Sequence, residues 1–277
     1  MPGIKPGVAV PLYDGVVRWT APNPGFMTGE GTNAYILGTH KLTLIDPGPV
    51  IDSNIAALID YCDGRLERVV VTHTHRDHCP AAMAIAGATG VPVYGSLPPS
   101  GEENDAGFLP DVMLQEGQRI VCDYLNMDVL HTPGHASNHY CFLVREASLL
   151  LTGDHIMNGS TVVIAAPDGN MAAYLRSLSR LQDMGFAAIG PGHGDLIHDP
   201  VENINGIIAH RLARERKVLS ALQAVSPCTV DELLPHAYDD VDARLLPVAR
   251  YSLCAHVEKL LDEGVIDEMD SRLQATP

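Results

Sequence analysis

The sequence predicts an α+β fold in which two β-sheets pack face to face with helices outside them. Short apolar runs alternate with amphipathic stretches in the order strands, helix, strand, helix, and this order then repeats. After Asp199-Pro200 the strand patterns give way to long helical ones, which predicts a separate C-terminal module. We therefore expect a first domain over residues 1–200 and a second over residues 201–277.

The first half of the larger domain alternates between runs rich in β-branched residues, which predict strands, and stretches with helical spacing of apolar residues. A segment rich in Gly, Pro, Ser and acidic residues follows and predicts a mobile surface loop. The expected elements are strands within 16–19, 33–46 and 68–71, helices over 51–61 and 77–88, and the loop over 96–110.

Strand patterns resume over residues 118–152, and the amphipathic stretch 170–184 predicts another helix. The C-terminal part has a different order of helix, short helix, helix and strand, which is typical of a small winged-helix-like module. Its expected elements are a helix over 201–225, a short capped helix within 227–234, a helix over 246–263 and a strand over 264–269.

The segment 72–78, Thr-His-Thr-His-Arg-Asp-His, is the most informative part of the chain. It follows a run that predicts a buried strand, and within six residues it gathers the ligand-type side chains His73, His75, Asp77 and His78. Crowded imidazoles repel one another when protonated and are costly to desolvate, and a divalent cation removes both problems. The alternative is a polar surface loop that happens to be rich in His, but the rest of the chain supplies further ligands.

Three further apolar runs end in a ligand-type residue, namely His135, Asp154 and His193. Each follows directly on a glycine, which lets the backbone turn sharply and lets a metal approach closely. Any one of these segments is an ordinary turn by itself. Four such segments in series predict that the seven ligands converge on a metal centre at one edge of the sandwich.

With these motifs, residues 15–200 resemble the metallo-beta-lactamase superfamily, which implies an αβ/βα sandwich. By that resemblance, His73, His75 and His135 hold one metal. Asp77, His78 and His193 hold the second, and Asp154 bridges the two. Asp77 is also the predicted catalytic residue.

The resemblance also places Asp46, in Leu44-Ile45-Asp46-Pro47-Gly48, behind the ligands as a supporting carboxylate. The local sequence around Asp46 is equally typical of an ordinary aspartate that starts a turn before Pro-Gly. His139 could contact the ligands or the substrate, or it could lie on the surface at the start of a strand.

The helix with His210, Arg211 and Arg214 and the winged-helix-like tail narrow the resemblance to the beta-lactamase-like protein 2 group; glyoxalase II is also similar. The animal members of that group are endoribonucleases that act on single-stranded RNA. The three helix residues could hold an acidic group of a substrate or pair with neighbouring Glu residues.

The ligand set predicts a dinuclear metal-dependent hydrolase that uses a metal-bridging hydroxide on a small ester, thioester or related acyl substrate. One alternative is an endoribonuclease that cleaves single-stranded RNA. A second is a mononuclear iron dioxygenase, because His73, His135 and Asp154 would suit a two-His-one-carboxylate site. Nitrogen and carboxylate ligands without a thiolate favour two zinc ions per chain, although iron or manganese also suits them.

The composition sets the expected partners and location. The formal net charge of −16 disfavours nucleic acid and favours a small-molecule substrate, although it does not exclude a local basic groove. The chain lacks an apolar run of roughly 20 residues and a signal peptide, so we expect a cytoplasmic protein without a membrane partner. Its six cysteines lack Cys-x-x-Cys spacing and are expected to be free thiols. A homo-oligomer is compatible with this composition.

Overall fold

The structure, a computed structural model, describes residues 4–275. It divides into two compact units, which we call the sandwich unit and the helical unit. The sandwich unit comprises the chain up to Thr132, Asn138–Val162 and Met184–Pro200, and the helical unit comprises Pro133–Ser137, Val163–Asp183 and the chain from Val201. The expected domain boundary at residue 200 stays a prediction; this division groups two earlier segments with the helical unit.

The first sheet of the sandwich unit has seven strands in the order β1 to β7. Neighbours are antiparallel from β1 to β4 and parallel from β4 to β7. Parallel neighbours need a crossover, and α1 (Asp52–Cys62) and α2 (Pro80–Thr89) provide the first two. The strands are β1 (Ala9–Tyr13), β2 (Val16–Thr20), β3 (Asn33–Leu37), β4 (Leu42–Ile45), β5 (Leu66–Val70), β6 (Val93–Gly95) and β7 (Val112–Met113).

The second sheet has five strands in the order β12-β11-β10-β9-β8. All its neighbours are antiparallel except β11 and β12, which run parallel. The strands are β8 (Arg119–Cys122), β9 (Leu125–His131), β10 (Tyr140–Val144), β11 (Leu149–Gly153) and β12 (Ala188–Pro191).

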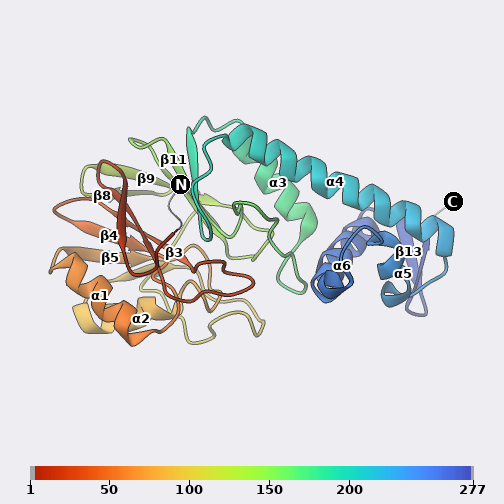
Figure 1. Cartoon of the computed structure of the whole chain (residues 1–277), viewed down its shortest axis with the longest axis horizontal. Helices are drawn as coiled ribbons and strands as arrows, with labels where there is room; N and C mark the ends of the chain where they lie inside the picture. Colours follow the sequence, from red (N-terminus) through yellow and green to blue (C-terminus); the bar gives the residue numbers. More distant parts are fainter. Residues whose placement is uncertain (1–3, 276–277) are drawn as a thin grey trace. The chain divides into compact units, whose positions relative to one another are not determined.

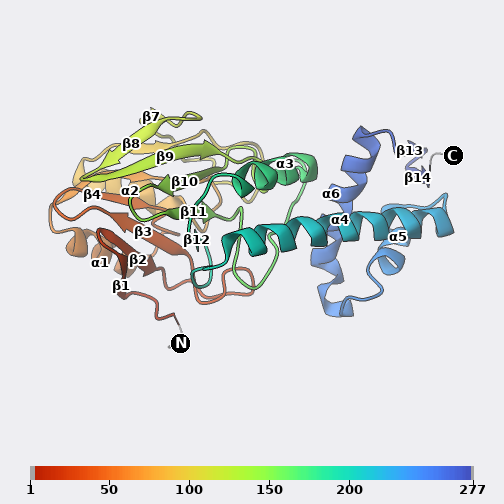
Figure 2. The ribbon, with the colours of Figure 1, turned by 90° about the horizontal axis from the view of Figure 1, so that it is seen from above.

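The core of the sandwich unit follows from the alternation of side chains along each strand. One face of the first sheet, with Tyr35, packs against the second sheet, with Phe142, in a single buried cluster. The opposite face carries Ile36, which belongs to a second cluster with Leu58 of α1 and Ile85 of α2. The two sheets therefore lie face to face with α1 and α2 outside the first sheet (Figures 1 and 2), which confirms the predicted architecture.

The helical unit has its own buried core, built from α4, α5, α6 and the hairpin β13–β14. Thr229 and Glu232 form a capping box at the start of α5, as the sequence predicts. Helix, short helix, helix and hairpin are the elements of a winged helix. The elements are α3 (Met171–Gln182), α4 (Pro200–Val225), α5 (Val230–Ala237), the 3₁₀ turn η1 (Ala243–Leu245), α6 (Leu246–Asp262), β13 (Ile266–Met269) and β14 (Arg272–Ala275).

Two predicted elements differ from the observed ones. α2 begins at Pro80 rather than Asp77, because residues 77–79 form a turn and proline suits the first helical position. The segment 96–110 has no helix or strand, as expected, but it is anchored: Phe108 is 2% exposed in the core, and Asn104 accepts a hydrogen bond from Thr74. In residues 4–275 no helix is long and apolar enough to cross a bilayer.

Candidate metal centre

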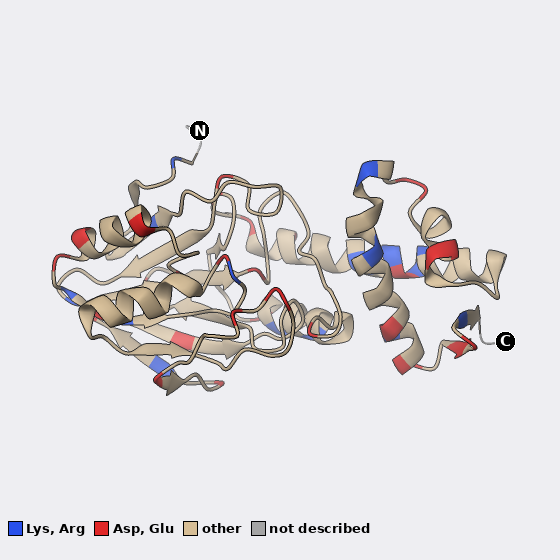
Figure 3. Ribbon diagram, turned by 90° about the horizontal axis from the view of Figure 1, so that it is seen from below, with Lys and Arg blue, Asp and Glu red and all other residues tan. Residues whose placement is uncertain are grey.

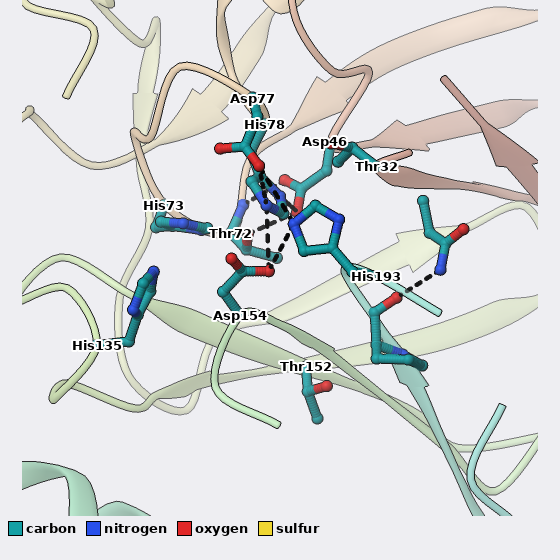
Figure 4. A network of polar contacts seen from close by, with 12 residues as sticks. Thr32, Asp46, Thr72, His73, Asp77, His78, His135, Thr152, Asp154 and His193 are labelled. Carbon is teal, nitrogen blue, oxygen red and sulfur yellow. Dashed lines mark hydrogen bonds and ion pairs between the residues drawn. The ribbon is translucent and has the colours of Figure 1, made fainter. Parts of the chain in front are cut away.

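The structure brings the seven predicted ligands together in two groups. His73, His75 and His135 form the first group, and Asp77, His78, Asp154 and His193 form the second. Within each group, one ligand-type atom from every residue lies within 4.8 Å of the others. Figure 4 shows His193, His78 and the two carboxylates facing one another, with His73 and His135 beside them.

The ligands lie where strands end. The turn after β5 carries His73, His75, Asp77 and His78, and Asp154 directly follows β11. His193 follows β12, which pairs in parallel with β11, so Asp154 and His193 leave the same edge of the second sheet. The strands thus position the start of each turn, and the turns contain the ligand-type side chains.

Gly192 shows how tightly these turns approach. A Cβ atom at this position would lie 2.5 Å from Asp154 Oδ1 and 2.8 Å from His78 Cε1. Any side chain larger than hydrogen would therefore displace two predicted ligands. The glycine beside His193 is a spatial requirement of the second group.

Backbone carbonyls orient two of the histidines. His135 Nδ1 lies 2.7 Å from the carbonyl oxygen of Val163, and His193 Nδ1 lies 3.1 Å from that of Gly31. A carbonyl only accepts, so each Nδ1 carries the proton and donates it. The lone pair of each neutral ring is then on Nε2, the nitrogen available to a metal.

Asp46 orients one histidine of each group. Its carboxylate accepts from His78 Nδ1 at 3.0 Å and from the hydroxyl of Thr72 at 2.6 Å. The single hydroxyl proton of Thr72 is committed to Asp46, so the Thr72 oxygen accepts from His73 Nδ1 at 3.0 Å. Asp46 is 2% exposed and adopts a φ of 48°, a left-handed conformation that Asp tolerates better than most residues. The supporting role predicted for it matches this geometry.

Opposite charges face each other in the second group. His78 Nε2 lies 3.2 Å from Asp154 Oδ1, and His193 Nε2 lies 3.2 Å from Asp77 Oδ2. Burial alone would lower the pKa of His193, but Asp154 and Asp77 raise it to about 10. The pKa of His78 is likewise raised well above its usual range, against burial, by the charges of Asp154 and Asp77. Burial opposes ionisation of Asp154, yet His193 and His78 hold its pKa well below the usual range.

The first group has the opposite character. Burial, together with the neighbouring His78 and His75 rings, lowers the pKa of His73 well below its usual range. Its ring centroid lies 4.5 Å from that of His75 and 4.4 Å from that of His78. The neutral ring of His73 therefore offers a nitrogen lone pair without a competing proton.

This donor set fits two divalent cations. In the second group, two carboxylates and two Nε2 atoms face one another, and a positive charge between them stabilises this arrangement. In the protein alone, protons on the two histidines supply that charge. A bound cation would supply it in their place. The first group offers three imidazole nitrogens, and four of the five ligand-type histidines have Nδ1 held by an acceptor. Such holding of the distal nitrogen is the usual support for histidine ligands in metal sites.

Sequence reasoning missed two supporting residues, Thr72 and Asn33. Asn33 donates from Nδ2 to the carbonyl oxygens of Pro191 and Gly194, on either side of His193. A buried amide at the start of the otherwise largely apolar strand β3 was the available signal.

Other singled-out residues make contacts of their own. His139 is buried behind His73, with ring centroids 5.0 Å apart, so a surface position is wrong for it. In the helical unit Arg211 is buried over the ring of Tyr174 at 5.6 Å. Arg214 pairs with Asp240, at 2.9 Å, rather than with a neighbouring Glu.

Comparison with known proteins agrees with the fold. The family model described as "Metallo-beta-lactamase superfamily" matches residues 27–193, more than half of the chain. The model described as "Beta-lactamase associated winged helix domain" matches residues 229–273.

Individual relatives extend the similarity over most of the chain. A "Beta-lactamase-like protein 2 homolog" from Caenorhabditis elegans is 29% identical over 265 residues, covering 92% of this chain and 87% of the relative. An "Atrochrysone carboxyl ACP thioesterase" from Aspergillus chevalieri is 32% identical over 216 residues, covering 75% of this chain and 66% of the relative.

A solved "Beta-lactamase domain protein" from Burkholderia ambifaria has the same fold, with a TM-score of 0.84 at 20% identity over 99% of this chain and 95% of that one. The family models, the relatives and this fold agree with the architecture described above. The chain belongs to the metallo-beta-lactamase superfamily and carries the associated winged-helix domain.

Proposed function

We propose that this protein is a dinuclear metal-dependent hydrolase that acts on a small ester, thioester or related acyl substrate. The single observation that carries the proposal is the pair of ligand groups, because a structural site would need only one closed set of four ligands. His73, His75 and His135 would hold one ion. Asp77, His78 and His193 would hold the other, with Asp154 between them.

Divalent ions held there would supply Lewis acidity and a water of lowered pKa, so that no Ser or Cys nucleophile is required. Nitrogen and carboxylate donors without thiolate favour zinc, and iron or manganese would also suit them. A mononuclear iron site would use only His73, His135 and Asp154. The other residues of the second group, Asp77, His78 and His193, would then have no function in metal binding.

The protein's own residues provide orientation and proton transfer. Asp77 is the more accessible carboxylate, with 32% of its side chain exposed against 10% for Asp154. Burial opposes its ionisation, but the charge of His78 and the hydrogen bond from His193 lower the pKa of Asp77, so it stays ionised at neutral pH. Oδ2 faces His78 and His193 and would hold the ion, so we assign the other carboxylate oxygen, Oδ1, the role of accepting a proton from the attacking water. Asp46 and Thr72 keep His78 and His73 in the required orientation.

Cleavage of single-stranded RNA is the second candidate, because the resemblance to the beta-lactamase-like protein 2 group implies it and the similarity to one such relative covers 92% of this chain. The charges of that domain oppose it. All four cationic side chains of residues 229–273 lie in ion pairs: Arg244 with Asp242, Arg250 with Asp231, Lys259 with Glu215 and Glu263, and Arg272 with Glu232. Figure 3 shows both blue and red segments in this part of the chain, so a phosphate backbone would have to compete with these acidic partners.

Elemental analysis and hydrolase assays test the proposal together. We expect close to two transition-metal ions per chain, mainly zinc, and ester or thioester hydrolysis that chelation abolishes and added metal restores. Asp154→Ala should lose occupancy at both positions, whereas Asp183→Ala, the same change at an exposed aspartate, should keep both. Metal-free protein that still hydrolyses these substrates after chelation would refute the proposal.

A further inference from the structure

The turn that carries His193 has little regular structure of its own. It follows the short strand β12, and residues 192–196 are neither helix nor strand. The position of His193 therefore depends on hydrogen bonds from other elements. Most of them come from one short segment, Gly31 to Tyr35.

Asn33 makes the central contacts. Its side chain is 1% exposed, and both Nδ2 protons are used: one donates to Pro191 O at 3.0 Å and the other to Gly194 O at 2.8 Å. Its backbone N–H donates to Gly192 O at 2.7 Å. One residue thus binds the turn at three carbonyl groups that flank His193.

The surrounding contacts make this amide hard to replace. Its Oδ1 accepts from the hydroxyl of Thr20 at 2.8 Å, so the orientation of the amide is fixed and the two protons point toward the turn. Tyr35, two residues along the same strand, donates from its hydroxyl to Pro191 O at 2.9 Å. A buried amide is costly unless its bonding capacity is used, and here it is used on the turn.

We infer that Asn33 is a positioning residue that holds His193 in the second ligand group by clamping both sides of its turn. The inference rests on the proposed metal centre and extends it to a residue that contacts no predicted ligand side chain. Asn33 forms hydrogen bonds with the turn of His193 and with Thr20. Its loss should therefore weaken the second ion and spare the one held by His73, His75 and His135.

Asn33→Asp is the sharpest variant, because aspartate has the same shape but cannot donate to the two carbonyls. Ile36→Ala is the matched control: it removes a buried side chain from the same strand, on the face that packs against α1 and α2, without touching the turn. Tyr35→Phe removes only one hydroxyl bond to Pro191 O and provides a milder test if Asn33→Asp does not fold. Titration of metal-free protein with Co²⁺, followed by its absorption spectrum, reports the two ions separately from activity.

The wild-type protein should bind two Co²⁺ ions. In Asn33→Asp the second-group ion should bind about 10–100-fold more weakly, the range typical of lost outer contacts in metal sites, with the first-group ion unchanged. Tyr35→Phe should show a smaller loss at the same ion, and Ile36→Ala none. Wild-type affinities in Asn33→Asp and Tyr35→Phe, or an equal loss in Ile36→Ala, would overturn the inference while leaving the metal centre intact. Wild-type protein that binds no Co²⁺ would instead refute the proposed function.

Discussion

At the residue scale, Thr72 makes three of the hydrogen bonds that support the site. Its backbone N–H and its hydroxyl both donate to Asp46, at 2.7 and 2.6 Å, and its oxygen accepts from His73. The Asp46 carboxylate orients the Thr72 hydroxyl, and the Thr72 hydroxyl in turn orients the imidazole of His73. Removing it should release one ligand without changing the backbone.

Thr72→Val tests this arrangement, because valine keeps the branched shape and lacks the hydroxyl. We expect the first-group ion to bind about 10–100-fold more weakly, since His73 loses the acceptor of its Nδ1 proton. Competition with a chromophoric zinc chelator measures the affinity. Thr72→Ser, which retains the hydroxyl, should bind within a few-fold of wild type; equal behaviour of the two variants would show that the hydroxyl does not orient His73.

The residues that form the two ligand groups could be predicted from the sequence, and most of the residues that support them could not. His-x-His-x-Asp-His after a buried strand is local information, as is a glycine before each of the other ligands. The partners of the Nδ1 atoms are not local: Gly31 lies 162 residues from His193, and Val163 lies 28 residues from His135. A carbonyl group is present at every residue, so its selection as an acceptor is decided only by the folded backbone.

At the scale of elements, α6 contains a buried titratable side chain. His256 is fully buried, and its Nδ1 lies 3.6 Å from Glu215 of α4. Burial lowers the pKa of His256, the nearby Glu215 carboxylate opposes this, and the Arg211 charge lowers the pKa further; the net direction is downward. The folded protein therefore keeps this imidazole neutral where the unfolded chain would protonate it.

The helical unit should accordingly lose stability on acidification. Below the unfolded pKa of about 6.5 the unfolded chain binds a proton that the folded chain does not, so stability falls with pH until the folded pKa is reached. The loss from this group is at most about 1.4 kcal/mol per pH unit. Calorimetry at pH 7.5 and 5.5 should show a smaller fall for His256→Gln, which cannot titrate; identical falls would exclude His256 as the cause.

Most elements follow from apolar periodicity, and the exceptions have physical reasons. The strand β1 (Ala9–Tyr13) contains Pro11 and is only partly buried, so it lacks the apolar run that marks a central strand. It forms the edge of the first sheet, the place where a proline is tolerated. The predicted helix starts at Asp77, but its first three residues belong to the turn that contains predicted ligands. The spacing of apolar residues does not distinguish such a turn from the start of a helix.

At the scale of the whole molecule, charge separates the two candidate substrates. The net charge of −16 and the paired cations of the winged-helix domain disfavour a polyanion. A small acyl substrate is not subject to this repulsion to the same degree.

Metal-loaded protein should hydrolyse aryl esters or acyl thioesters at rates that change little between 50 and 200 mM salt. An RNase would lose activity steeply over the same range, because binding to phosphates releases counterions. Asp77→Ala, assayed with both substrates, should abolish the metal-dependent activity. Salt-sensitive RNA cleavage that disappears in this variant, without ester turnover in the wild type, would establish the second candidate.

Asp46 also couples the binding of the two metal ions. Because one carboxylate contacts His78 directly and His73 through Thr72, an ion that orders either histidine fixes the carboxylate for the other. Loading is then expected to be cooperative: singly loaded protein should be scarce at half saturation, and native mass spectrometry would detect mainly chains with no ion or with two. In Asp46→Asn only one side-chain oxygen remains to accept hydrogen bonds, and a singly loaded population should emerge.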